Sequence, residues 1–134
     1  GGLGIHREFE IMGEGVTLNT YGERQALPPW GLNGGMDGKG GEFWRITPDG
    51  KRTRIPTKQT GMRLDKGDIV EVRTPGSGGY GDPKSRDPQR VLQDVQEALV
   101  SPESARADYG VAIVCTASGD FALDEAGTAA LRSH

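Results

Sequence analysis

The 134-residue sequence has a single cysteine, Cys115, and therefore has no internal disulfide and no cysteine-rich zinc site. Histidine is also scarce, because only His6 and the terminal His134 are present. We therefore expect no metal site within this segment. His6 is interpreted as a polar residue on a strand face, although it could join ligands from sequence outside this chain. Cys115 follows an apolar run and is interpreted as a small core residue.

Long apolar runs and a surplus of positive charge are absent as well. No stretch approaches the roughly 20 apolar residues of a membrane-spanning helix, and no charged-then-apolar leader is present. We expect a soluble, cytoplasmic protein without a membrane partner. The 16 Lys and Arg against 19 Asp and Glu provide no field that attracts a phosphate backbone, so nucleic acid is not an expected partner. The basic residues 51–54 are interpreted as a solvated strand edge.

Large apolar residues are few for a folded chain. Only 26 residues are Leu, Ile, Val or Phe, beside 22 Gly and 8 Pro, a composition close to that of disorder. The small net charge of −3 and the short alternating apolar runs favour a folded, loop-rich chain instead. The glycines gather in two loops, residues 31–41 and 76–81, and Trp30 is expected to anchor the first.

Alternating apolar and polar residues predict a β-rich portion over residues 1–86. Strands are expected at residues 5–11, 16–21, 42–46, 53–55 and 69–73, with a further strand opening at Leu64. The first two strands are predicted to pair as a hairpin, and the turn at residues 48–50 to close another. Arg7 shares the apolar face of the first strand with Ile5, Phe9 and Ile11.

Residues 87–134 have helical periodicity. The pattern predicts a helix over residues 88–99 with Asp87 as its N-cap, a short helix starting at Ser101-Pro102, a strand over 111–115, and a last helix capped by Asp124. We therefore predict an α+β fold. An antiparallel β-sandwich or partly closed barrel is followed by a helix-helix-strand-helix tail, and the two portions are expected to form one structural unit.

Residues 76–81 match the G-x-G-x-x-G pattern of dinucleotide-binding loops. That interpretation is rejected, because the preceding strand is amphipathic, whereas the first strand of a dinucleotide-binding sheet is buried on both faces. The next helix also starts too late to face a phosphate held by the glycines. We interpret the segment as a tight loop that could shape a site or a subunit contact. No complete set of catalytic groups is recognisable, so the catalytic residues are unknown.

Several segments taken together resemble the hydantoinase B/oxoprolinase family. They are GGLGIHREF at residues 1–9, PPWGLNGG at 28–35, and KGD at 66–68 followed by TPGSGGYGDP at 74–83, with further similarity over 86–95 and 100–111. Ser77 stands where the family usually has another glycine. The resemblance covers about residues 1–128. It corresponds to the C-terminal portion of a much longer polypeptide. The chain also begins without methionine, so we expect a fragment or a processed piece.

The resemblance implies part of an ATP-dependent enzyme that opens cyclic amides such as 5-oxoproline or hydantoins through phosphorylation of a carbonyl oxygen. A hydantoinase A-type subunit or domain would bind ATP and Mg²⁺. The rest of the hydantoinase B chain would complete the site and hold any divalent metal. This segment alone is expected to bind none of these cofactors and to be inactive. The alternatives are a ketone carboxylase subunit and a non-catalytic module that assembles subunits.

We expect a further set of residues to position a loop at the substrate site or at a partner interface. These candidates are Arg7, Trp30, Gly78, Gly79, Tyr80, Gly81, Asp82 and Arg86.

Overall fold

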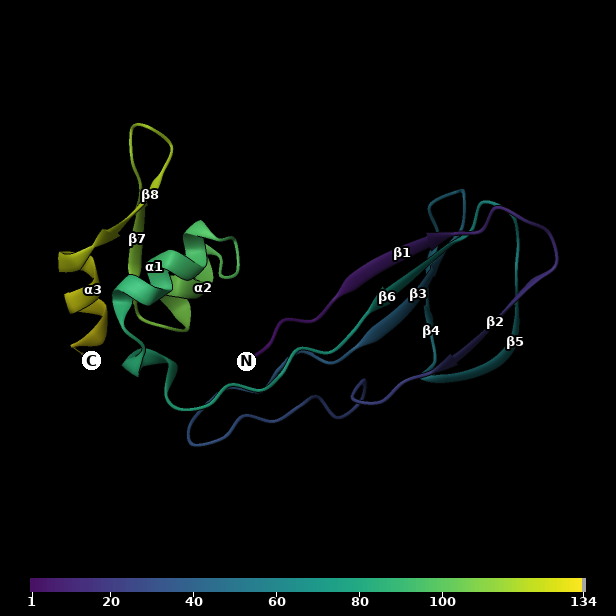
Figure 1. Cartoon of the computed structure of the whole chain (residues 1–134), viewed down its shortest axis with the longest axis horizontal. Helices are drawn as coiled ribbons and strands as arrows, with labels where there is room; N and C mark the ends of the chain where they lie inside the picture. The colour runs from purple at the N-terminus through teal and green to yellow at the C-terminus, as the bar shows by residue number, and fades with distance from the viewer. Residues whose placement is uncertain (134) are drawn as a thin grey trace. The chain divides into compact units, whose positions relative to one another are not determined.

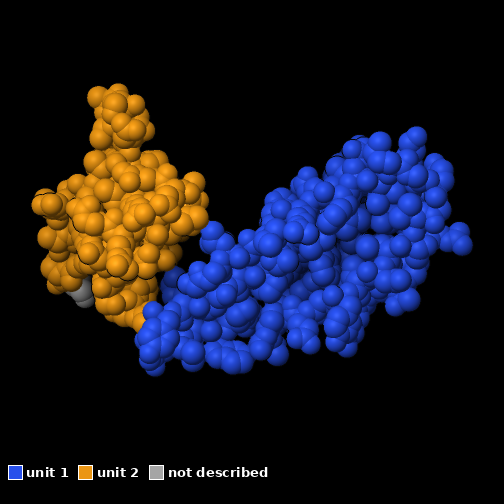
Figure 2. All heavy atoms as spheres, in the orientation of Figure 1, with its two compact units in different colours: residues 1–80 blue, residues 81–134 orange. Residues whose placement is uncertain are grey.

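The computed structural model describes residues 1–133, which divide into two compact units (Figure 1, Figure 2). The first unit covers residues 1–80 and the second begins at residue 81. The boundary predicted at residue 86 thus lies inside the second unit. None of the helices within residues 1–133 is long and apolar enough to cross a membrane.

The first unit is built from two antiparallel sheets. The larger contains β1 (His6–Glu10), β6 (Ile69–Arg73), β3 (Glu42–Ile46) and β4 (Arg52–Ile55), in that order across the sheet. The smaller pairs β2 (Val16–Tyr21) with β5 (Lys58–Leu64). Side chains from both sheets share one buried core around Ile55, Leu64 and Val70. The antiparallel sandwich followed by helices that the sequence predicts is therefore confirmed.

The strand pairing differs from the prediction in one respect. The expected β1–β2 hairpin is wrong, because β1 pairs with β6 and β2 pairs with β5. The chain passes from one sheet to the other after Ile11, whose backbone N–H donates to the Asp68 carbonyl at 2.8 Å. Leu64 ends β5 and does not open a new strand. The β3–β4 hairpin is confirmed, and Gly50 closes its turn at a φ of 83°.

Three extended segments continue from the strands of the first unit with few buried side chains. We call residues 1–5, 29–40 and 74–80 the glycine bundle, since their backbones lie side by side (Figure 1). Ser77 N–H donates to the Gly2 carbonyl at 2.9 Å, and Leu32 N–H donates to the Gly79 carbonyl at 2.9 Å. The two glycine-rich loops found in the sequence therefore form one assembly.

The second unit carries the predicted helices. After a short 3₁₀ helix (Pro83–Ser85) come α1 (Pro88–Gln96), α2 (Pro102–Ala107), β7 (Ala112–Cys115), β8 (Phe121–Asp124) and α3 (Glu125–Arg132). The side chains of Asp87, Ser101 and Asp124 cap the three α-helices as predicted. Helix α1 ends before residue 99, because Ala98 adopts a left-handed φ of 57°. The core of the second unit is formed by Val91, Val95, Ala105 and Val111.

Two predictions for the second unit are corrected. Strand β8 pairs with β7 and was missed, because its four residues follow a turn and directly precede a helix cap. Cys115 is exposed at the end of β7, so the prediction that it is a core residue is wrong. The buried part of the apolar run is its beginning, Val111 and Ala112.

Candidate functional site

Glu71 lies on the central strand β6 and is only 2 % exposed, although it points to the face opposite the apolar core. Glu8 on β1 and Trp44 on β3 flank it in register. The alternation of residues 69–73 places this carboxylate on the polar face of the strand. The structure covers it instead with long side chains from the neighbouring strands. The arginines of β4 and β6 are the sequence signal that could have indicated partners for this carboxylate.

The carboxylate of Glu71 is held by two arginines. Arg52 donates to Oε2 from Nη2 at 2.7 Å and from Nε at 3.2 Å, and Arg73 donates to Oε1. The Arg52 guanidinium also stacks over the Trp44 ring, 4.1 Å from its centre. Burial by itself raises the pKa of Glu71, but the hydrogen bonds from Arg52 and Arg73 outweigh burial and lower that pKa. The side chain is therefore an anion at neutral pH.

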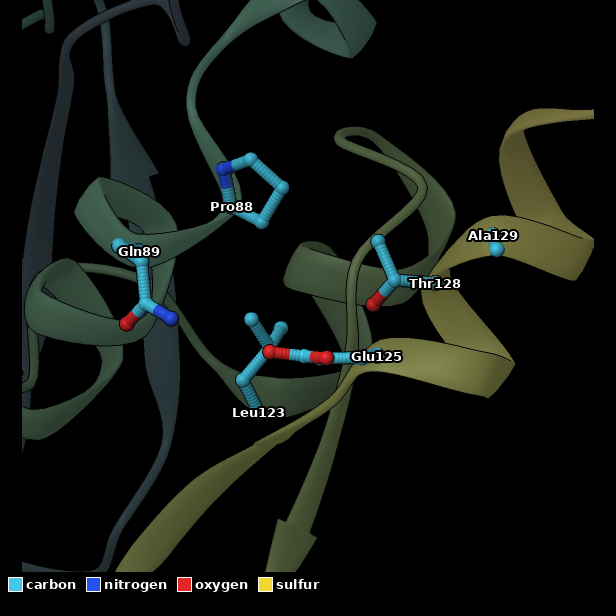
Figure 3. A pocket seen from close by; sticks show the side chains of 6 residues that line it. All are labelled: Pro88, Gln89, Leu123, Glu125, Thr128 and Ala129. Atoms are coloured by element: carbon cyan, nitrogen blue, oxygen red, sulfur yellow. The ribbon is translucent and has the colours of Figure 1, made fainter.

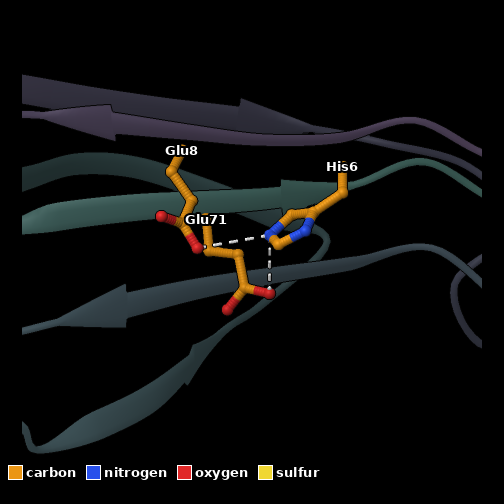
Figure 4. Close-up of side chains that lie close together, drawn as sticks. All are labelled: His6, Glu8 and Glu71. Carbon is orange, nitrogen blue, oxygen red and sulfur yellow. Dashed lines mark ion pairs between the residues drawn. The ribbon is translucent and has the colours of Figure 1, made fainter.

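His6 joins this cluster from β1. Its Nε2 lies 3.1 Å from Glu71 Oε1 and 3.4 Å from Glu8 Oε1 (Figure 4). The three side chains place ligand atoms within 4.8 Å of one another, a spacing that a divalent cation could bridge. Both oxygens of Glu71 already accept hydrogen bonds from guanidinium groups, which supply the compensating positive charge. The cluster therefore has the properties of an ion-pair network, and it was not foreseen from the sequence.

A second buried carboxylate, Asp68, serves the turn between β5 and β6. Its Oδ2 accepts from the backbone N–H of Asp65 at 2.8 Å and lies 2.6 Å from Nη2 of Arg45. Arg45 also reaches Asp65 at 2.9 Å, and the two acidic groups raise the pKa of Arg45. These contacts fix the path of the turn, so Asp68 has a structural role.

Four of the candidate residues meet in the glycine bundle. A Cβ on Gly78 would lie 1.9 Å from the carbonyl oxygen of Trp30, and a Cβ on Gly35 would lie 2.2 Å from that of Gly79. Only glycine permits this backbone contact. The Tyr80 hydroxyl accepts a hydrogen bond from Asn33 Nδ2 at 2.6 Å, while the rings of Trp30 and Tyr80 remain exposed. The bundle therefore presents two exposed aromatic rings on a closely packed backbone.

The other four candidates lie elsewhere. Arg7 is exposed on β1, opposite Val72 of β6. Gly81, Asp82 and Arg86 belong to the second unit. There the Asp82 side chain accepts from the backbone N–H of Lys84 at 2.9 Å, as the cap of the 3₁₀ helix, and Arg86 pairs with Asp94 at 2.8 Å. These contacts give Asp82 and Arg86 local structural roles.

The second unit also contains an open pocket of about 350 Å³ (Figure 3). Its lining residues come from α1, β8 and α3, namely Pro88, Gln89, Leu123, Glu125, Thr128 and Ala129. The Thr128 hydroxyl already accepts from the Ala112 N–H at 3.0 Å. Glu125 is the one ionisable residue among these six, so the pocket lacks the paired groups that acid–base catalysis uses.

Comparison with known proteins gives consistent matches. A family model described as hydantoinase B/oxoprolinase matches residues 1–83. The chain is 40 % identical to an uncharacterised protein of Methanocaldococcus jannaschii, over 98 % of this chain and 23 % of that protein. It is 36 % identical to the caprolactamase subunit beta of Pseudomonas jessenii, over 99 % of this chain and 23 % of the relative.

A solved structure agrees with these sequence matches. The nucleotide-free structure of an acetone carboxylase, solved to study ATP-dependent acetone carboxylation, superposes with a TM-score of 0.64 and 28 % sequence identity. The match covers 78 % of this chain and 18 % of the acetone carboxylase chain. The present chain thus spans about a quarter or less of the length of these relatives.

Proposed function

The chain belongs to the hydantoinase B/oxoprolinase family, and on that basis we propose that it forms the C-terminal portion of an ATP-dependent cyclic-amide hydrolase. One observation carries this proposal. Nearly the whole chain aligns with less than a quarter of the caprolactamase subunit beta, whose name denotes action on a cyclic amide. The proposed substrate class is therefore a cyclic amide such as 5-oxoproline, a hydantoin or another lactam.

The side chains of this segment support a positioning role in that enzyme. Both oxygens of Glu71 accept hydrogen bonds from arginines, Asp82 caps the 3₁₀ helix, and Gly78 is required by close backbone contact. We propose that the rest of the hydantoinase B chain supplies the substrate site and any divalent metal. A hydantoinase A-type partner would bind ATP and Mg²⁺, and ATP would activate the amide oxygen by phosphorylation. The segment alone would be inactive, and the assembly would act in the cytoplasm.

A ketone carboxylase subunit is the second candidate. The superposition on acetone carboxylase, at a TM-score of 0.64, favours it specifically. In both candidates ATP would activate a carbonyl-derived oxygen, so the substrate and the requirement for bicarbonate separate them. The third possibility is a non-catalytic module that only assembles subunits.

The test uses the complete hydantoinase B polypeptide that carries this sequence, purified together with its hydantoinase A-type partner. ATP hydrolysis and ring opening are measured with 5-oxoproline, a hydantoin and caprolactam, and separately with acetone plus bicarbonate. We expect ring opening that requires ATP and both subunits, and no turnover by the 134-residue chain alone.

Other outcomes assign the alternatives. Turnover that needs both a ketone and bicarbonate would show that the assembly is a carboxylase and would contradict the proposed hydrolase activity. An assembly that forms by size-exclusion chromatography but converts none of these substrates would favour the assembly module. Ring opening by the 134-residue chain without a partner would contradict the proposed division of labour.

A further inference from the structure

The apolar face of the four-stranded sheet continues onto β1, where no other element covers it. Phe9 is directly opposite Val70, yet Val70 is 4 % exposed and Phe9 is 51 % exposed. The β2–β5 sheet covers the apolar residues of β3, β4 and β6, but neither Phe9 nor Ile5 belongs to the shared core. A row of core positions thus ends in solvent at β1, where burial of Phe9 and Ile5 would be favourable.

The backbone of β1 is also open on its outer side. The backbone carbonyl of Ile5 accepts from the Thr74 N–H, and the backbone N–H of Ile11 donates to the Asp68 carbonyl. Both hydrogen bonds lie on the side of β1 that faces β6. Hydrogen bonding alternates along an antiparallel strand, so Arg7 and Phe9 also bond toward β6. The N–H and C=O groups of the even-numbered residues, His6, Glu8 and Glu10, consequently point away from the sheet. Since β1 is the last strand of the sheet, these groups can pair with another strand.

Arg7 lies between Ile5 and Phe9 on the same apolar face. Arg7 is exposed and, among the described residues, makes no ion pair, so a strand added over this face would remove its charge from water without a partner of its own. A covering segment that carries a carboxylate opposite Arg7 would satisfy this charge while its apolar side chains cover Phe9.

We propose that the outer edge of β1 receives an extended segment of the hydantoinase B polypeptide from outside these 134 residues. The segment adds a strand to the sheet, places apolar side chains over Ile5 and Phe9, and pairs an acidic residue with Arg7. This docking mode rests on the proposed function, because it takes the chain to be part of a longer hydantoinase B polypeptide.

Two observations favour this occupant. The matching portion makes up only 18 % of the acetone carboxylase chain and 23 % of the caprolactamase subunit, so most of each relative lies outside it. A second copy of β1 fits poorly. Antiparallel self-pairing centred on Arg7 or Glu8 sets that residue against itself, and pairing centred on Phe9 sets Glu8 against Glu10. Like charges placed directly opposite destabilise a sheet.

Hydrogen–deuterium exchange resolved by residue, on the complete polypeptide in its assembled state, tests the pairing. The amides of Arg7 and Phe9 serve as an internal reference, since they bond to β6. We expect the amides of His6, Glu8 and Glu10 to exchange at least about 10-fold more slowly than unprotected amides. Exchange at unprotected rates would overturn the proposal. Protection confined to a concentration-dependent dimer would also overturn it, in favour of a second copy.

A proline substitution gives an independent test. Glu8→Pro removes only an outward N–H, which a free edge strand tolerates, whereas Phe9→Pro removes a bond to β6. Glu8→Ala is the matched control, because it also deletes the carboxylate but keeps the N–H. We expect a lower melting temperature for Glu8→Pro than for Glu8→Ala in the complete polypeptide. Equal melting temperatures, with Phe9→Pro still destabilising, would contradict strand addition.

The two proposals fail separately. Protection of the even-numbered amides in a protein that opens no cyclic amide would leave the docking edge intact and contradict the proposed function. Ring opening by a protein in which the amides of His6, Glu8 and Glu10 are unprotected would support the proposed function and contradict the docking edge.

Discussion

At the scale of single residues, Glu71 is a buried side chain whose two oxygens both accept hydrogen bonds. Its charge is matched by Arg52 and Arg73, and the Arg52 guanidinium is in turn held against the Trp44 ring. Removing one member of such a network leaves the others with fewer partners. The two arginines are 40 % and 47 % exposed, so water can replace part of the loss.

Glu71→Gln should therefore destabilise the first unit by about 1–3 kcal/mol, because the neutral amide accepts fewer hydrogen bonds and turns a donor toward the arginines. Urea denaturation of the assembled polypeptide measures the change. Glu8→Gln, at a side chain that is 53 % exposed, is the control, and we expect it to cost less than about 0.5 kcal/mol. A similar cost for both variants would show that burial of the Glu71 charge has no special importance.

The pH dependence of the same network has a definite sign. The pKa of folded Glu71 lies below its ordinary value of 4.5, so the ionised group stabilises the fold above pH 4.5. That contribution is lost as the pH falls from 4.5 through the lower, folded pKa. The difference in stability between the wild type and Glu71→Gln should be constant near neutral pH and shrink below pH 4.5. Denaturation midpoints measured from pH 7 to pH 3 would contradict this if the difference grew on acidification.

At the scale of elements, the glycine bundle is held together by backbone contacts, whereas the strands are held together by side-chain packing as well. Gly35 and Gly78 each approach another segment so closely that a Cβ would lie within 2.2 Å of a carbonyl oxygen, and a Cβ on Gly31 would lie 1.9 Å from the carbonyl oxygen of Gly35 in its own segment. The bundle thus needs glycine for close packing as well as for turns. This requirement explains why a composition near that of disorder belongs to an ordered structure.

Gly78→Ala should distort the bundle, because its methyl group would lie 1.9 Å from the Trp30 carbonyl oxygen. We expect a loss of about 2 kcal/mol or more and faster hydrogen exchange of the Leu32 and Gly79 amides, which bond across the bundle. Gly13→Ala is the matched control, since a Cβ there meets no atom within 4 Å and the backbone has no left-handed φ. Equal exchange in the two variants would contradict close packing as the reason for Gly78.

The strands and helices show which features local sequence determines. The caps at Asp87, Ser101 and Asp124 and the turn at Gly50 are local, and all were predicted. The pairing of β1 with β6 joins residues about 60 positions apart, so the alternation of neighbouring residues could not distinguish it from a hairpin. Period-two alternation likewise could not show that Glu71 is buried, because burial by side chains of other strands leaves no trace in the strand itself.

The candidate site was predictable only in part. The clustering of glycines around Trp30 and Tyr80 pointed to segments that do lie together. Asp82 and Arg86 were adjacent to that loop in sequence, but their contacts are local caps and ion pairs of the second unit. Their roles at a substrate or partner site remain predictions.

At the scale of the whole molecule, each unit carries its own hydrophobic core. The core around Ile55, Leu64 and Val70 uses residues of 1–80 only, and the core around Val91 and Val111 uses residues from 81 onward only. Because the buried side chains are not shared, a cavity made in one core should weaken that unit first.

Val91→Ala should therefore destabilise the second unit by about 2 kcal/mol, since the side chain is fully buried, and should accelerate exchange of the Val95 and Val111 amides by roughly 30-fold. The Leu64 and Val70 amides should keep their wild-type rates. Ile55→Val is the reciprocal variant, and its cost of about 1 kcal/mol should appear at Leu64 and Val70 while Val95 and Val111 are unchanged. Equal acceleration in both cores by either substitution would contradict this expectation. It would mean that the two units unfold together in one cooperative step, because only a shared unfolding step exposes the amides of both cores.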